Sequence, residues 1–271
     1  EAHLGDEAEA FAALAAKLED ISAVGIDILA LLFDDMKGDQ PDLAARQVRM
    51  TEFCAARMRA SGLIMCPSYY SDDPILDRVF GARPAHYLAD LGRGLDPAIG
   101  IFWTGNKVCA TEFNIADMER VGAEMRRKPF LWDNYPVNDG PRMSKHLHLK
   151  AFTGRPAALA NVCAGHAINP ALQPVLSRIP ALTLTASYRD GAGYDAAAAF
   201  AAAATEVLGA DLAGRLADDA PALQDLGLDA EDAQKDVWRA RYAAFAHPAA
   251  REIIGWLDGI YGVSAELVQT Q

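Results

Sequence analysis

Five short, almost wholly apolar segments recur along the chain and predict buried β-strands. They are residues 25–33, 62–66, 99–103, 129–132 and 158–168. Between most of these segments the apolar residues are spaced three and four apart, as in residues 41–62, and this spacing is typical of an amphipathic α-helix. Continuous apolar strands that alternate with such helices indicate parallel βα units whose sheet is buried on both faces.

Polar residues gather just after these strands, whereas the connections before the strands are plain. The polar groups are Asp34–Asp35 and residues 67–73, 104–107, 133–139 and 169–170. Polar chemistry at the carboxyl ends of strands is typical of a (β/α)8 TIM barrel, and also of an open doubly wound sheet. A G-x-G-x-x-G loop does not follow the first strand, which disfavours a dinucleotide-binding fold. We therefore predict an α/β protein of the (β/α)8 barrel class.

Five strands do not close an eight-stranded barrel, so we expect this chain to hold about five of the eight βα units. The N-terminal units are expected in front of Glu1, supplied by the same protein, because a sheet edge and part of the core would otherwise be exposed. Residues 1–190 are predicted to form the C-terminal part of the catalytic barrel. Residues 191–271 are helical by period and composition, and are predicted to form a helical subdomain.

Charge and composition narrow the possible partners. The net charge of −12 disfavours nucleic acid, whose phosphates require clustered Lys and Arg. No apolar run reaches the roughly 18 residues of a membrane span, so no membrane partner is expected. The four cysteines lack a C-x-x-C pair and lie in or beside apolar stretches, so we expect buried free thiols and a cytoplasmic location. Abundant alanine and arginine suggest a bacterial source.

The adjacent carboxylates Asp34 and Asp35 are the sharpest chemical signal, because an apolar strand delivers them to the mouth of the predicted barrel. An acidic helix cap or a solvated turn is the alternative. Two carboxyls this close do not ionise independently, so one can act as an acid and the other as a base. Neighbours on one strand end are badly placed to flank a sugar, but they suit a substrate whose own 2-acetamido group is the nucleophile.

The segment WDNYPVND, residues 132–139, has the composition of a sugar-binding loop. Trp132 and Tyr135 would form an apolar wall, and Asn134 and Asp139 would hydrogen-bond to hydroxyls. A polar loop with one core aromatic residue is the alternative. Two further candidates for the same site are a tyrosine of residues 68–70 and the amide of Asn169.

His146 and His148 alternate as metal ligands often do, but no third ligand has a suitable spacing. We therefore interpret them as surface or supporting histidines and expect no metal.

The motifs LLFDDM, MCPSYY, FWTG, WDNYPVND and INP, in this order and at these spacings, resemble glycoside hydrolase family 84. That family holds the O-GlcNAcases and related bacterial β-N-acetylglucosaminidases, some of them labelled hyaluronidases. The resemblance covers residues 1 to about 190 and implies a (β/α)8 barrel without a metal or an organic cofactor. A Gly-rich strand end and a sugar-binding Lys, which family members carry in their first three βα units, do not occur in this chain.

The resemblance also implies roles for individual residues. Asp34 would bind and polarise the acetamido N–H, and Asp35 would be the general acid and then the base. Tyr70 would contact the acetamido region, although its neighbour Tyr69 is an alternative for that role. Trp132 would wall the acetamido pocket, Asn134 would hold the sugar, and Asp139 and Asn169 would bind its hydroxyls.

These roles predict a retaining exo-β-N-acetylglucosaminidase that removes O-linked GlcNAc from proteins or glycans through an oxazoline intermediate. The alternative is a non-catalytic barrel fragment that binds GlcNAc-bearing peptides. The sequence leaves open which aglycone is preferred and which oligomer forms.

Overall fold

The computed structural model describes residues 7–58 and 60–263. By its internal contacts the chain divides into two compact units, which are described separately. The first holds the chain up to Val108, Ile115–Leu131 and Val162–Gly165. The second holds Cys109–Asn114, Trp132–Asn161 and the chain from His166 onward.

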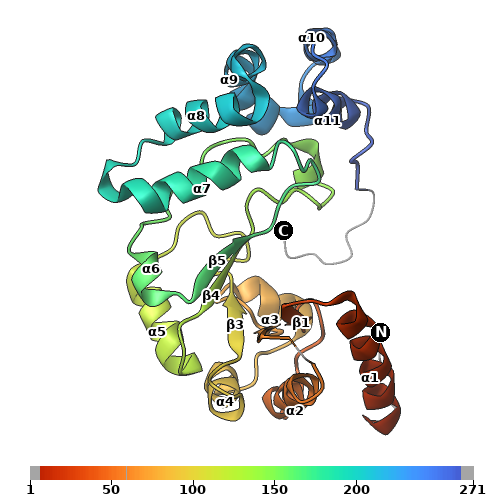
Figure 1. The fold of residues 1–271 in the computed structure, drawn as a ribbon, viewed down its shortest axis with the longest axis vertical. Coiled ribbons are helices and arrows are strands. Elements are labelled where there is room, and N and C mark those ends of the chain that lie inside the picture. The colour runs from red at the N-terminus through yellow and green to blue at the C-terminus, as the bar shows by residue number, and fades with distance from the viewer. Residues whose placement is uncertain (1–6, 59, 264–271) are drawn as a thin grey trace. The chain divides into compact units, whose positions relative to one another are not determined.

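Five parallel strands form one sheet, in the order in which they occur along the chain (Figure 1). The strands are β1 (Ile28–Leu32), β2 (Gly62–Cys66), β3 (Gly100–Trp103), β4 (Phe130–Asp133) and β5 (Gly165–Ile168). Ile28 pairs with Gly62, Ile64 with Gly100, and Phe102 with Phe130. This sequential parallel order is the one that consecutive βα units produce.

The helices of the first unit lie between its strands, apart from α1, which precedes β1 (Figure 1). They are α1 (Glu7–Val24), α2 (Leu43–Ala55), α3 (Pro74–Phe80), α4 (Tyr87–Gly94) and α5 (Ile115–Met125). Asp73 caps α3 by accepting a hydrogen bond from the Ile75 backbone, with Pro74 at the first helical position. Met65, Ile101 and Leu131 are fully buried in the strands.

The second unit contains the remaining helices. These are α7 (Arg178–Asp190), α8 (Ala196–Leu208), α9 (Ala210–Asp225), α10 (Asp232–Ala243) and α11 (Pro248–Leu257). The short helix α6 (Leu159–Val162) is divided between the two units. Short 3-10 turns are η1 (Met143–Lys145), η2 (Gly191–Gly193) and η3 (Gly227–Asp229). Trp238, Tyr242 and Trp256 are buried in a core that also takes in Leu147 and Ile179. The predicted domain boundary at residue 190 stays a prediction.

The sequence pattern located the strands well and some helix boundaries less well. Each of the five predicted strands is present, and the prediction for residues 62–66 is confirmed to the residue. The apolar segment 158–168 is wrong as one strand, because Leu159–Val162 forms α6 and only Gly165–Ile168 is strand. A continuous apolar run does not distinguish a buried turn of helix from a buried strand.

Several predictions about the interior are also confirmed. The four cysteines are free thiols; Cys54, Cys66 and Cys163 are buried, and Cys109 is half-buried. Phe33, directly after β1, and Trp103, at the end of β3, lie in the core. Within the described residues, none of the helices has the length and apolarity that a membrane span requires.

Candidate active site

The first unit carries the carboxylate pair in a tight turn, residues 33–35, which we call the acid turn. The Phe33 N–H donates to the Cys66 carbonyl at 2.9 Å and so continues the ladder between β1 and β2 to the start of this turn. Asp34 is half-buried, and this burial raises the pKa of its carboxyl, although a backbone hydrogen bond opposes the shift. Asp35 is exposed and has a φ of 58°, a left-handed conformation uncommon outside glycine.

The two neighbouring tyrosines after β2 differ in what their hydroxyls contact. The Tyr70 hydroxyl donates to Oδ1 of Asp35 at 3.3 Å. The Tyr69 hydroxyl instead donates to the Gly81 carbonyl at 2.6 Å, and its ring is fully buried. Of the two residues, Tyr70 is therefore the one that lies at the acid turn.

A ring of neutral hydrogen bonds lies behind the acid turn, and its members were not singled out from the sequence. The Gln47 amide donates to the Ser68 hydroxyl at 2.8 Å, and the Ser68 N–H donates to the Tyr87 hydroxyl at 3.0 Å. The Tyr87 hydroxyl bonds in turn to Oε1 of Gln47. All three residues are buried, and the Ser68 hydroxyl donates onward to the Phe33 carbonyl at 2.6 Å.

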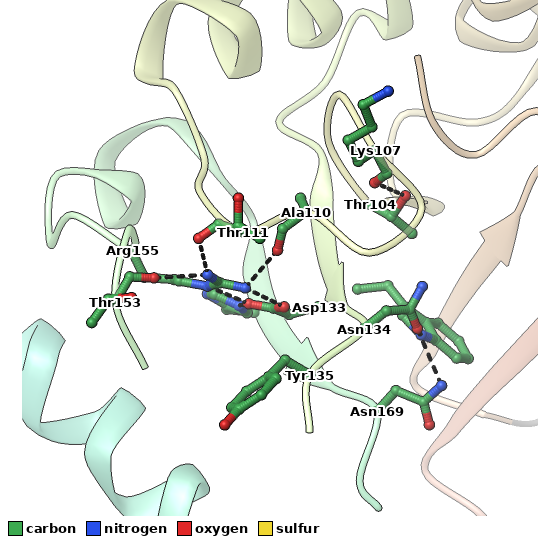
Figure 2. Close-up of polar contacts among 12 residues, drawn as sticks. Thr104, Lys107, Ala110, Thr111, Asp133, Asn134, Tyr135, Thr153, Arg155 and Asn169 are labelled. Carbon is green, nitrogen blue, oxygen red and sulfur yellow. Dashed lines mark hydrogen bonds and ion pairs between the residues drawn. The ribbon is translucent and has the colours of Figure 1, made fainter. Parts of the chain in front are cut away.

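The second unit carries the predicted sugar-binding residues. They lie at the end of β4, on the loop of residues 134–139 that follows it, and just after β5. The indole N–H of Trp132 donates to Oδ1 of Asn134 at 3.0 Å. The Asn169 amide donates to the same oxygen at 3.2 Å, as Figure 2 shows. Three of the residues predicted from the sequence therefore form one cluster, although they come from two different strand ends.

A buried charged network, which the sequence did not reveal, lies at the end of β4. Nε and Nη2 of Arg155 donate to the two carboxylate oxygens of Asp133 at 2.8 and 2.7 Å. Figure 2 shows the same guanidinium reaching the carbonyls of Ala110, Thr111 and Thr153. Nε2 of His166 lies 3.1 Å from Oδ2 of Asp133. Bidentate geometry of this kind is typical of the strongest carboxylate–guanidinium pairs.

Asn138, which is also buried, was not identified from the sequence as a residue that supports the site. Its amide nitrogen donates to the His146 carbonyl at 3.0 Å and to Oε1 of Gln173 at 2.9 Å. Its amide oxygen accepts from the Leu172 N–H at 2.9 Å. Asn138 thus ties the loop after β4 to the segment after β5, whereas its neighbour Asp139 is exposed.

Tyr135 and the two candidate metal histidines are engaged in packing. The Tyr135 hydroxyl donates to the Lys150 carbonyl at 2.8 Å, and its ring stacks on His148. Figure 2 shows Tyr135 and Asn134 pointing to different sides of the chain, which disfavours Tyr135 as part of a sugar wall shared with Asn134. Nδ1 of His146 lies 2.9 Å from the Gln224 carbonyl. Among the described residues, His, Cys, Asp and Glu form no group of three suited to a metal.

A cavity of about 620 Å³ lies within the second unit. Its walls come largely from α8, α9 and the segment around Phe152, and include Phe200, Ala217 and Pro221. Gln224, which lines it, accepts hydrogen bonds from the Leu149 and Lys150 backbones. Asn134, one of the predicted sugar-binding residues, also lines this cavity.

The five parallel strands of one sheet, with polar residues at their carboxyl ends, define the class of protein, an α/β protein with part of a (β/α)8 barrel. A profile of the β-N-acetylglucosaminidase family matches residues 4–224. The chain belongs to this family, glycoside hydrolase family 84, and the resemblance seen in its motifs is confirmed.

Relatives in the curated sequences agree with this membership. The protein O-GlcNAcases of Mus musculus and Rattus norvegicus are each 28% identical to the chain over 184 residues, or 64% of it. The chain spans about a fifth of the length of these relatives, 19% of each.

Solved structures show the same fold. A mutant of the O-GlcNAc hydrolase of Thermobaculum terrenum superimposes with a TM-score of 0.71 at 24% identity, covering 93% of this chain and 62% of that one. A protein named CpGH84B gives a TM-score of 0.66 at 20% identity, covering 95% of this chain and 51% of that one. The predicted fold class is confirmed, with five of the parallel strands present in this chain.

Proposed function

We propose that the protein containing this chain is a retaining exo-β-N-acetylglucosaminidase that removes O-linked GlcNAc. The acid turn carries this proposal: a half-buried carboxyl lies beside an exposed carboxyl that a tyrosine contacts, in a chain of this glycosidase family. The cluster of Trp132, Asn134 and Asn169 adds an aromatic face and two amides after neighbouring strands of the same sheet.

In the first step of the proposed reaction, the substrate supplies its own nucleophile. Asp34 accepts the acetamido N–H, so that the acetamido carbonyl oxygen becomes more nucleophilic and attacks the anomeric carbon. Asp35 gives its proton to the glycosidic oxygen as the bond to the aglycone breaks. The products of this step are the free hydroxyl of the aglycone and a bicyclic oxazoline in its protonated form, whose N–H stays hydrogen-bonded to Asp34.

In the second step Asp35, now a carboxylate, takes a proton from water, and the water oxygen attacks the anomeric carbon. The oxazoline ring opens and restores the acetamido group. Two successive inversions at one carbon give retention of configuration. We assign the acetamido pocket to Tyr70 and Trp132, and the sugar hydroxyls to Asn134, Asp139 and Asn169.

The proposed substrates are GlcNAc-bearing proteins or glycans. Protein-linked GlcNAc is favoured because the curated relatives are named protein O-GlcNAcases. We further propose that the remaining βα units of the barrel come from the same protein, because five strands do not close an eight-stranded barrel.

The test is hydrolysis of a chromogenic β-GlcNAc substrate by the full-length protein and by its Asp34→Asn and Asp35→Asn variants. Each substitution is expected to lower turnover by roughly 10²- to 10⁴-fold, the usual loss when general acid–base catalysis is removed. Asp20→Asn, on the exposed surface of α1, is the matched control and should keep full activity. Turnover within about threefold of the unaltered protein for both variants would contradict the assigned roles.

Binding and catalysis can be separated with the same proteins. A calorimetric titration with an O-GlcNAc peptide that gives heat but no free sugar would support the alternative, a GlcNAc-binding barrel. Heat together with release of β-GlcNAc, identified by NMR before mutarotation, would support the retaining enzyme.

A further inference from the structure

The regular backbone hydrogen bonding between β1 and β2 ends at the acid turn. In a parallel pair the hydrogen bonds are evenly spaced, so the rung after Phe33 N–H to Cys66 carbonyl would run from the Ser68 N–H to the Phe33 carbonyl. The Ser68 N–H instead donates to the Tyr87 hydroxyl, and the Ser68 side chain takes over the bond to the Phe33 carbonyl at 2.6 Å. A side chain thus replaces a backbone rung directly before Asp34.

The direction of every proton in this network follows from the groups present. A backbone N–H only donates, so the Tyr87 oxygen accepts from Ser68 and its own proton goes to Oε1 of Gln47. The Gln47 amide nitrogen then donates to the Ser68 hydroxyl oxygen. The one proton of that hydroxyl is left for the Phe33 carbonyl.

That carbonyl belongs to the planar peptide group whose nitrogen is the backbone nitrogen of Asp34. Fixing the carbonyl therefore fixes this peptide plane, which ends at the Cα of Asp34, the first residue of the carboxylate pair. Asp35 follows in a left-handed conformation that is uncommon for a residue with a side chain. Two residues after Ser68, Tyr70 contacts the Asp35 carboxylate, so one short segment bonds to both ends of the acid turn.

We propose that Ser68 is a positioning residue for the carboxylate pair, and that Gln47 and Tyr87 hold its hydroxyl in the orientation this requires. The inference rests on the proposed function. Ser68 acts through the backbone of the acid turn, since its hydroxyl is fully buried and already has two partners. Its removal should misplace Asp35, and the reaction should suffer most where proton transfer to the leaving group matters most.

The experiment compares two β-GlcNAc substrates in the full-length protein: a dinitrophenyl glycoside, which departs without protonation, and a GlcNAc-serine peptide, which needs it. For Ser68→Ala we expect kcat/KM on the peptide to fall by about 100-fold, and on the dinitrophenyl glycoside by less than about tenfold. Ser68→Cys, whose thiol is a weaker donor of similar shape, should fall between Ser68→Ala and the unaltered protein. Ser187→Ala removes another buried hydroxyl bonded to a carbonyl, in the second unit, and should leave the ratio between the two substrates unchanged.

A purely structural role for Ser68 predicts a different result. Loss of folded protein would lower activity on both substrates by one factor, and that outcome would overturn the inference. If Ser68→Ala does not fold, Tyr87→Phe tests the same network from α4 and should change the ratio in the same direction. Failure of the unaltered protein to hydrolyse either substrate would instead refute the proposed function, on which the inference rests.

Discussion

Two buried networks, one neutral and one charged, hold the acid turn in the first unit and the loop after β4 in the second. Behind the acid turn, Gln47, Ser68 and Tyr87 form a ring of neutral hydrogen bonds. At the end of β4, Arg155 and Asp133 form a buried ion pair that His166 extends. Both networks hold backbone next to candidate residues, but only the second does so with charge.

This difference fits the chemistry proposed for each region. The proposed role of Asp35 is to release and recover a proton in each turnover, and a fixed charge nearby would favour one of its protonation states. The neutral donors hold the turn without adding a charge to that of the neighbouring Asp34. The binding role proposed for Asn134 and Asn169 involves no change of charge, so a buried arginine and carboxylate close to them carry no such penalty. The buried ion pair therefore lies beside residues that are proposed only to position the sugar.

The largest effect is expected from breaking the charged network. Arg155→Met leaves the Asp133 carboxylate buried without its bidentate partner, which costs about 3–5 kcal/mol of unfolding free energy. Arg155→Lys keeps the charge but not the two parallel hydrogen bonds, so it should recover only part of the loss. Urea unfolding followed by circular dichroism measures both values.

The control for this prediction is the exposed ion pair of Arg189 with Asp190. Arg189→Met removes a charge of the same kind from a solvated position and should leave the free energy of unfolding almost unchanged, because exposed ion pairs contribute little. Equal losses in the two arginine variants would show that burial does not set the strength of the Arg155 pair.

A smaller effect is expected from breaking the neutral ring. Tyr87→Phe leaves the Ser68 N–H and Oε1 of Gln47 buried without the hydrogen bonds that the Tyr87 hydroxyl makes with them, at a cost of about 1–3 kcal/mol. Tyr194→Phe is the matched control, because its hydroxyl donates to the Phe152 carbonyl from a half-exposed position. A Tyr87→Phe loss as large as that of Arg155→Met would remove the energetic distinction between the two networks.

The smallest effect concerns Asp34 and has the opposite sign. Burial raises the pKa of this carboxyl above its ordinary value of 3.8, so its contribution to stability falls as pH rises through the interval between the two values. Asp34→Asn should therefore be more stable than the unaltered protein at pH 7, with a gain that shrinks as pH falls toward 4. Unfolding midpoints in urea at several pH values test this, and a gain independent of pH would contradict it.

The sequence correctly predicted those features that depend on a single strand and the residues that directly follow it. The continuous apolar runs located the strands, and the residues at the strand ends included Trp132, Asn134 and Asn169, which the structure brings together. Tyr70 could be separated from Tyr69 only in the structure, because adjacent residues of one type look alike in a sequence while their hydroxyls meet different partners.

The two supporting networks could not be predicted from the sequence, for a related reason. Asp133 and Arg155 are 22 positions apart, and an aspartate at a strand end reads the same whether it is solvated or paired. Gln47, Ser68 and Tyr87 come from α2, the segment after β2 and the start of α4, and only Ser68 lies within a motif recognised in the sequence, MCPSYY. Such pairings depend on how elements pack, which hydrophobic periodicity does not specify.

The left-handed backbone at Asp35 also limits how this position can vary. Glycine and asparagine adopt a φ of 58° with little cost, whereas valine, isoleucine and threonine resist it because their branched β-carbons crowd the backbone. A saturation library at residue 35 should therefore sort into two populations: variants that fold but have lost proton transfer, and β-branched variants that have also lost the turn. The first population would report on chemistry, and the second on conformation.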